Sequence, residues 1–256
     1  MSLQLGSVLR ASGQKLFSRT GAILLLAYIA FTAALLPLAN TMIARIYERA
    51  GLTEAVGTVP LVLELPLSVA VGGYLVGLLV GGYLSLVAVR TFVTGDGDTF
   101  PTGAFTRNVP LALGNAVVGG FIYLLLMTVG FALLFIPGLI VYIAFLFMLP
   151  YIAVEDRNFV DALRSSYRLS RGNWLMLGVL VLVVFGIAGV IGIVGGLVPG
   201  LFLPPALAQL SVVSIQAPIS LFSLAVIAAA FDQLREGEAA GPGGSAPTAE
   251  TSSTPV

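Results

Sequence analysis

The sequence predicts an all-α, polytopic integral membrane protein with six transmembrane helices, short amphipathic interfacial helices and both termini in the cytoplasm. Two features of the composition lead to this prediction: 58% of the 256 residues are hydrophobic and only 9% are charged. A soluble domain carries about 25% charged residues, and so small a share would leave large apolar patches in water. The third feature is that the charges lie mainly in short segments between long charge-free blocks. Lipid is therefore the expected solvent.

The charge-free blocks define the expected spans. Blocks 20–44 and 65–89 are each long enough for one helix across a hydrocarbon core about 30 Å thick, at about 1.5 Å per residue. Blocks 108–154 and 172–231 are much longer, so each is expected to fold back on itself. Pro and Gly, the strongest local breakers, stand where turns are needed: Ile136-Pro137-Gly138 in the former block, Pro199-Gly200 and Pro204-Pro205 in the latter. The expected helices of these two blocks are 109–135, 138–154, 174–198 and 205–231.

The placement of basic residues predicts the orientation, because cytoplasmic loops carry an excess of Lys and Arg. With the N-terminus inside, only Arg45 and Arg49 fall outside. The inside segments hold Arg10, Lys15, Arg19, Arg90, Arg107, Arg157, Arg164, Arg168, Arg171 and Arg235. This asymmetry favours a multi-pass protein of the cell membrane with cytoplasmic N- and C-termini.

The spans form one expected domain, a six-helix transmembrane domain over residues 1–234. Residues 235–256 are rich in Gly, Pro, Ala, Ser and Thr, which predicts a disordered C-terminal tail. Three cytoplasmic segments, 3–20, 99–108 and 158–172, each lead into a pair of spans, and the first and third are similar in sequence. This similarity suggests a three-fold repeat of interfacial helix plus hairpin with a degenerate middle copy. The alternative is that any basic segment beside a membrane has this pattern.

The third cytoplasmic segment has the clearest pattern of a short amphipathic helix. Asn158 is expected to cap it, with Asp161 three residues on, and Gly172 is expected to end it. One face would carry Phe159, Leu163 and Tyr167, and another Arg164, Arg168 and Arg171. Such a helix is expected to lie in the interface plane, with its aromatic face toward the membrane and its arginines toward lipid headgroups.

A run of short motifs in this region resembles a known membrane module. The motifs are Ile136-Pro137-Gly138, Leu149-Pro150, Val154-Glu155-Asp156, Asp161-Ala162-Leu163-Arg164-Ser165-Ser166 and Leu169-Ser170-Arg171-Gly172-Asn173-Trp174. They resemble the membrane domain attached to some glycerophosphoryl diester phosphodiesterases, which is also found alone in YciC-like six-helix proteins. The resemblance implies a polytopic helical domain without the catalytic phosphodiesterase domain. The single Lys beside eleven Arg, and the acidic, Thr-rich tail, resemble haloarchaeal proteins in composition.

The residues that usually carry chemistry are scarce. The chain has no Cys and no His, which removes the thiol nucleophile and the commonest metal ligand and general base. None of the expected spans has an ionisable residue at mid-span, where proton pumps and transporters usually carry one. Glu155 and Asp156 are adjacent, which favours a solvated helix-terminal turn over a metal site. We therefore expect no enzyme, no cofactor, no metal site and no nucleic-acid partner.

Two kinds of residue stripe within the spans are candidate sites, one made of small residues and one made of polar residues. Small residues at every fourth position let helix backbones approach closely, and they occur at Gly73, Gly77 and Gly81 and again at Gly192 and Gly196. These glycines suggest helix packing within the chain or an interface with a second copy or another membrane protein. Gln209, Gln216, Ser220 and Ser223 lie roughly on one face of the sixth span beside Pro218. They suggest a polar path or, alternatively, hydrogen bonds between helices, with Asn115 as one possible partner.

The basic cytoplasmic segments are the third candidate. Arg164, Arg168 and Arg171, together with Arg10, Lys15 and Arg19, would attract anionic lipid by about 1 kcal/mol each, or would serve only as topology determinants. The sequence thus predicts a non-enzymatic membrane protein that organises lipid or a partner protein at the cytoplasmic face. The alternative is a small transporter or channel that uses the polar stripe of the sixth span.

Overall fold

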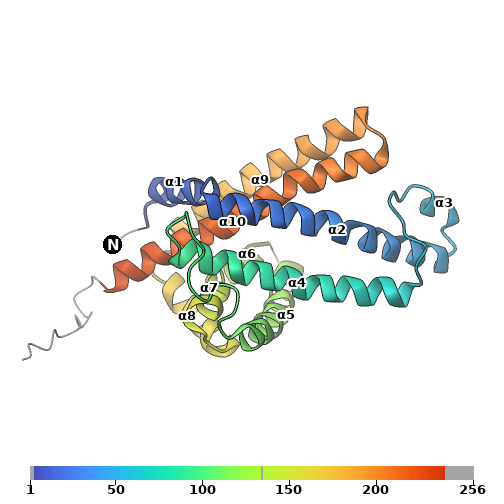
Figure 1. Cartoon of the computed structure of the whole chain (residues 1–256). Coiled ribbons are helices and arrows are strands. Elements are labelled where there is room, and N and C mark those ends of the chain that lie inside the picture. The colour runs from blue at the N-terminus through green and yellow to red at the C-terminus, as the bar shows by residue number, and fades with distance from the viewer. Residues whose placement is uncertain (1–2, 134, 240–256) are drawn as a thin grey trace, which may run out of the picture.

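The computed structural model describes residues 3–133 and 135–239, and this part of the chain is helical, with no strand. Figure 1 shows the arrangement of the helices. They are α1 (Leu5–Leu16), α2 (Arg19–Arg49), α3 (Thr53–Val56), α4 (Leu67–Thr94), α5 (Val109–Leu133), α6 (Phe135–Ala144), α7 (Met148–Glu155), α8 (Phe159–Ser170), α9 (Trp174–Phe202) and α10 (Pro205–Ala239).

Six stretches of the described residues are long and apolar enough to cross a membrane. They are Arg19–Arg49, Leu67–Thr94, Val109–Leu133, Ile136–Glu155, Trp174–Phe202 and Pro205–Glu238. An all-helical protein with six candidate spans is therefore confirmed by helix length and composition. The fourth candidate span comprises most of α6 together with α7, and it is not continuous.

Several helix ends differ from the predicted ones, and three of these differences involve a proline or the predicted tail. α6 begins at Phe135, so Pro137 lies in its first turn, where a proline removes no helical hydrogen bond. α9 continues through Pro199 to Phe202, and the break before α10 coincides with Pro204. α10 continues to Ala239, so residues 235–239 of the predicted tail are helical, and the rest of that tail lies outside the described residues.

The helices pack most closely at the end of the molecule that holds α1, α7, α8 and the C-terminal part of α10, which we call the packed end. Its buried side chains include Phe92, Phe147, Ile152 and Phe231, from α4, the α6–α7 turn, α7 and α10. The α2–α4 and α9–α10 pairs extend from this end in different directions (Figure 1). Beyond it their apolar side chains are largely exposed, as expected for helices whose outer surface meets lipid.

The first of the three basic segments, residues 3–20, contains α1, which lies along α10 at the packed end. Leu3 and Val8 are buried there, and Gln4 N donates to Gln233 Oε1 at 3.3 Å. Of the three segments proposed as a repeat, the first and third form helices, α1 and α8, whereas the middle one consists of turns.

Candidate functional site

The fourth candidate span is broken in its middle. α6 ends at Ala144 and α7 begins at Met148, and a turn separates them. Met148 N donates to Phe145 O rather than to Ala144 O. Within the described residues, Ala144 O and Phe147 N therefore make no backbone hydrogen bond across the turn. Backbone groups left unpaired at membrane depth are costly, so other groups must satisfy them.

Serines of α8 satisfy these backbone groups. Ser166 Oγ donates to Ala144 O at 2.9 Å and accepts from Phe147 N at 3.0 Å. Ser170 Oγ donates to Ile143 O at 3.0 Å. Both serines are fully buried. The break in the span and the serine face of α8 thus complement each other, and α8 is attached firmly to the spans.

The N-terminus of α8 is held by two asparagines. Asn158 Oδ1 accepts from Asp161 N at 2.9 Å, which confirms the predicted cap. Asn115 Oδ1, on α5, accepts from Phe159 N at 3.0 Å. Asn115 therefore binds the start of α8 and not the polar stripe of α10, contrary to one of the sequence-based expectations. At the other end Gly172 follows the helix without a positive φ, so it is not the left-handed stop that we expected.

The buried face of α8 is made mainly of small and polar residues, and it packs against the spans. The buried residues are Ala162, Ser165, Ser166, Leu169 and Ser170. The predicted apolar stripe lies at the edge of this face: Phe159 and Leu163 are half-buried, and Tyr167 is 43% exposed. Small residues face the spans because larger side chains would hold Ser166 and Ser170 too far from the backbone groups at the break between α6 and α7.

Opposite the serines, α8 and the residue that follows it present three arginines. At about 100° per residue, Arg164, Arg168 and Arg171 fall within an arc of about 60° on the exposed side. All three are exposed, and none of their guanidinium groups has a hydrogen bond or ion pair within the described part of the chain. We call them the α8 arginines. Their charge is available to a group outside the chain.

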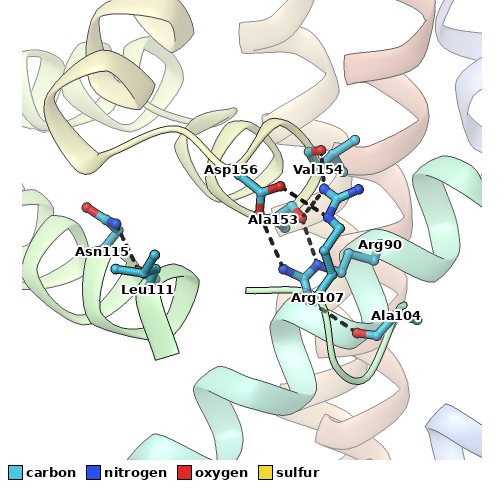
Figure 2. A network of polar contacts seen from close by, with 8 residues as sticks. All are labelled: Arg90, Ala104, Arg107, Leu111, Asn115, Ala153, Val154 and Asp156. Carbon is cyan, nitrogen blue, oxygen red and sulfur yellow. Dashed lines mark hydrogen bonds and ion pairs between the residues drawn. The ribbon is translucent and has the colours of Figure 1, made fainter. Parts of the chain in front are cut away.

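Other arginines at the packed end are already paired, and Figure 2 shows one such network. Arg90, only 4% exposed, donates from Nε to Ala153 O at 2.7 Å. Arg107 Nε lies 3.1 Å from Asp156 Oδ2, and the same guanidinium donates to Val154 O. Asp156 has a positive φ of 53°, which turns the chain directly after α7. The network connects α4, the segment before α5 and the end of α7.

A second pairing uses the neighbouring carboxylate. Glu155 lies 2.7 Å from Arg157 Nε and 3.3 Å from Arg235 Nε, while Arg157 Nη1 donates to Ser165 Oγ at 2.7 Å. The sequence suggested a solvated turn at these two carboxylates. The structure instead pairs each with two arginines, including distant ones on α4 and α10, which no local pattern could reveal. The described residues contain no group of three metal-ligating side chains.

The three basic residues of the first segment have different environments. Lys15 Nζ donates to Phe92 O and lies 3.4 Å from Asp232 Oδ2, so it joins α1 to α4 and α10. Arg10 and Arg19 are exposed, and no ion pair holds them within the described residues. Of the six candidate lipid-binding residues, Lys15 alone has an internal carboxylate partner among the described residues.

The glycines of α4 face α2. A Cβ at Gly73 would lie 3.2 Å from Leu38, one at Gly81 would lie 3.0 Å from Phe31, and one at Gly77 would overlap Leu35. These side chains belong to the same chain. On α9, Gly195 packs against Ile215, whereas a Cβ at Gly192 or Gly196 would meet little or nothing. The glycine of α9 that packs against α10 is therefore Gly195, and not Gly192 or Gly196 as the sequence suggested.

The polar residues of α10 do not face one neighbour. Gln209 forms a reciprocal amide pair with Asn40 of α2, at 2.7 and 3.1 Å. Gln216 and Ser220 are exposed, and Gln216 lies next to Gly192 of α9. Ser223 Oγ donates to Ile219 O of its own helix at 2.9 Å. Gln209 thus serves contact between helices, which was the alternative to a polar path.

A cavity of about 550 Å³ lies between α4, α5, the broken span and α10. Its lining is mainly apolar, with Leu78, Leu113, Met148 and Ile227 among the lining residues. Sequence reasoning missed this cavity because its walls come from five separate helices, α4, α5, α6, α7 and α10, and carry no motif. An apolar lining suits hydrocarbon better than a polar solute.

A family model described as Domain of unknown function (DUF7847) matches residues 3–234, which is nearly the whole described chain. No curated protein and no solved structure matches the chain. None of these comparisons supports the resemblance to the membrane domain of glycerophosphoryl diester phosphodiesterases or to YciC-like proteins.

Proposed function

This chain belongs to the DUF7847 family, a domain of unknown function, and we propose that it is a non-enzymatic membrane protein that organises anionic lipid at its cytoplasmic face. The observation that carries the proposal is the separation of the arginines into two groups. Arg90, Arg107, Arg157 and Arg235 are used within the fold, whereas Arg164, Arg168 and Arg171 are left free on one face of α8. A partner protein with an acidic surface is the second ligand that these charges suit.

The attachment of α8 supports a binding role. A basic segment that serves only as a topology determinant needs charge but no fixed position. Here Ser166, Ser170 and Asn115 fix α8 against the spans through hydrogen bonds of 2.9 to 3.0 Å. The arginines on the opposite face are therefore held in a defined arrangement, which lowers the entropic cost of binding a headgroup.

The expected strength follows from the charges. Each Arg beside an anionic leaflet contributes about 1 kcal/mol, so the α8 arginines together contribute about 3 kcal/mol. Since 1.4 kcal/mol is tenfold in an equilibrium constant, this is a preference of roughly 100-fold for anionic over zwitterionic lipid. Salt should weaken it, because exposed charges are screened within about 10 Å at 0.1 M.

The proposal is tested by lipid co-purification. Arg164→Gln, Arg168→Gln and Arg171→Gln combined should insert normally but retain much less anionic lipid in mild detergent. The matched control combines Arg45→Gln with Arg49→Gln. It removes two positive charges from the C-terminal end of α2 and leaves the α8 arginines in place. Retention that is unchanged in the α8 variant would contradict the proposal.

The proposal includes an orientation, with the packed end and both termini in the cytoplasm of a cell-membrane protein. It rests on the excess of basic residues in those segments. Because the chain has no Cys, single cysteines can be introduced at exposed positions and labelled from either side. Thr106→Cys should react with an impermeant thiol reagent only from the cytoplasm and Thr58→Cys only from outside. The reverse pattern would overturn the orientation.

The alternative function is a small transporter or channel that uses Gln209, Gln216, Ser220 and Ser223. The exposure of Gln216 and Ser220 is the observation that favours it. Purified protein in liposomes should then move a solute, and Gln209→Leu with Gln216→Leu should reduce that flux. Absence of flux across a broad solute panel would exclude it.

A further inference from the structure

The buried arginine of α4 has one nitrogen without a hydrogen-bond partner. Arg90 donates from Nε to Ala153 O at 2.7 Å and from Nη1 to Ala104 O at 3.2 Å. Its Nη2 is buried and makes no hydrogen bond within the described residues. The Oδ1 atom of Asp156 lies 3.9 Å away, beyond hydrogen-bond distance. A buried charged donor without an acceptor is costly, so an acceptor is expected there.

A small cavity is lined in part by Arg90. It measures about 20 Å³, and its lining includes Arg90, Thr94, Thr102, Gly103 and Arg107. Such a volume accommodates a group of about the size of one water molecule or one oxygen atom of a larger anion. Thr94, Thr102 and Arg107 are exposed, so the cavity lies next to the surface and the rest of an anion would remain outside.

The charges of this site do not cancel. Figure 2 shows the guanidinium groups of Arg90 and Arg107 both near the single carboxylate of Asp156. The neighbouring carboxylate, Glu155, is paired with Arg157 and Arg235. Two guanidinium groups with one carboxylate leave one positive charge, which favours an anion over water.

We propose that Arg90 and Arg107, at the mouth between α4, residues 101–107 and the end of α7, bind a phosphate-type oxyanion. One oxygen enters the cavity and accepts from Arg90 Nη2, and the remaining oxygens stay at the rim beside Arg107 and Thr102. Guanidinium groups match phosphate oxygens in geometry as well as charge, which distinguishes this ligand from a halide. The phosphate is supplied either by the headgroup of a phosphate-monoester lipid or by free phosphate. The site shares no residue with the α8 arginines and does not depend on the proposed function.

The experiment measures thermal unfolding of the detergent-solubilised protein, followed through the fluorescence of Trp174, the only tryptophan. Inorganic phosphate and dioctanoyl phosphatidic acid are added separately, with sodium chloride at matched ionic strength as the reference. Phosphate from at least one source should raise the unfolding midpoint more than chloride does. A response to inorganic phosphate indicates the free ion, and a response to phosphatidic acid alone indicates the lipid. No response beyond that of chloride to either compound overturns the proposal.

Two variants and two controls test whether the response to phosphate arises at Arg90 and Arg107. Arg107→Gln should weaken the apparent affinity about tenfold or more, since it removes half of the guanidinium pair. Thr102→Glu places a carboxylate at the rim, so it should abolish the response to phosphate, whereas Thr106→Glu on the same segment should retain it. The combined Gln variant of the α8 arginines should also retain the response. A full response in Thr102→Glu, or its loss in the α8 variant, would contradict a site at Arg90.

Discussion

Replacement of Ser166 by alanine tests whether the broken span depends on α8. The change removes the hydroxyl that donates to Ala144 O and accepts from Phe147 N, at 2.9 and 3.0 Å. Neither backbone group has another hydrogen-bond partner within the described residues. A buried polar group left unpaired costs about 1–3 kcal/mol, whereas side-chain hydrogen bonds between membrane helices average only about 0.6 kcal/mol. Because two backbone groups are left unpaired at once, we expect Ser166→Ala to lower the free energy of unfolding by about 2–3 kcal/mol.

The assay is reversible unfolding in mixed detergent–lipid micelles, followed by fluorescence of Trp174, which lies at the start of α9 and packs edge-on against Tyr167 of α8. Ser170→Ala should cost less, about 1 kcal/mol, because Ile143 O also accepts from Leu146 N. Ser214→Ala is the control, since Ser214 is exposed and bonds only within its own helix. A cost for Ser166→Ala as small as that of Ser214→Ala would refute the idea that α8 completes the broken span.

Two further predictions concern packing among the spans. Gly77→Ala should be less stable than Gly72→Ala by about 1 kcal/mol, because a Cβ at Gly77 would overlap the end of the Leu35 side chain of α2, whereas a Cβ at Gly72 meets nothing within 4 Å. Comparing the two alanine variants cancels the gain in helix propensity that both share, and equal effects would contradict the packing. Asn40→Leu and Gln209→Leu, combined in a double-mutant cycle, should show a coupling energy of about 0.6–1.7 kcal/mol, and a coupling of zero would mean that their amide pair does not form in the membrane.

Much of the fold follows from composition and charge. Charge-free blocks predict the spans because a helix across hydrocarbon requires a fixed length of apolar residues. The cap of α8 was also predictable, since Asn158 and Asp161 are three residues apart and interact locally. The break between Ala144 and Met148 could not be predicted from the sequence, because its residues are uniformly apolar and contain neither Pro nor Gly.

The candidate site was only partly predictable for a similar reason. The α8 arginines were recognised from their spacing along one helix. The pairing of Arg90 with Ala153 and Asp156 joins residues more than sixty positions apart, and the orientation of α8 depends on serines whose partners lie on another helix. A pattern in one segment shows which faces exist, whereas the partner of each face is decided by tertiary packing.

The most direct test of the central claim is fluorescence quenching of Trp174 by brominated lipids, because this residue lies three positions after Arg171. In vesicles that mix anionic and zwitterionic lipid, brominated anionic lipid should quench Trp174 more strongly than its bulk fraction predicts, and added salt should reduce the excess. The combined Arg164→Gln, Arg168→Gln and Arg171→Gln variant should lose the excess. Quenching that follows the bulk fraction in the unmodified protein, or that is unchanged in this variant, would contradict lipid binding by the α8 arginines.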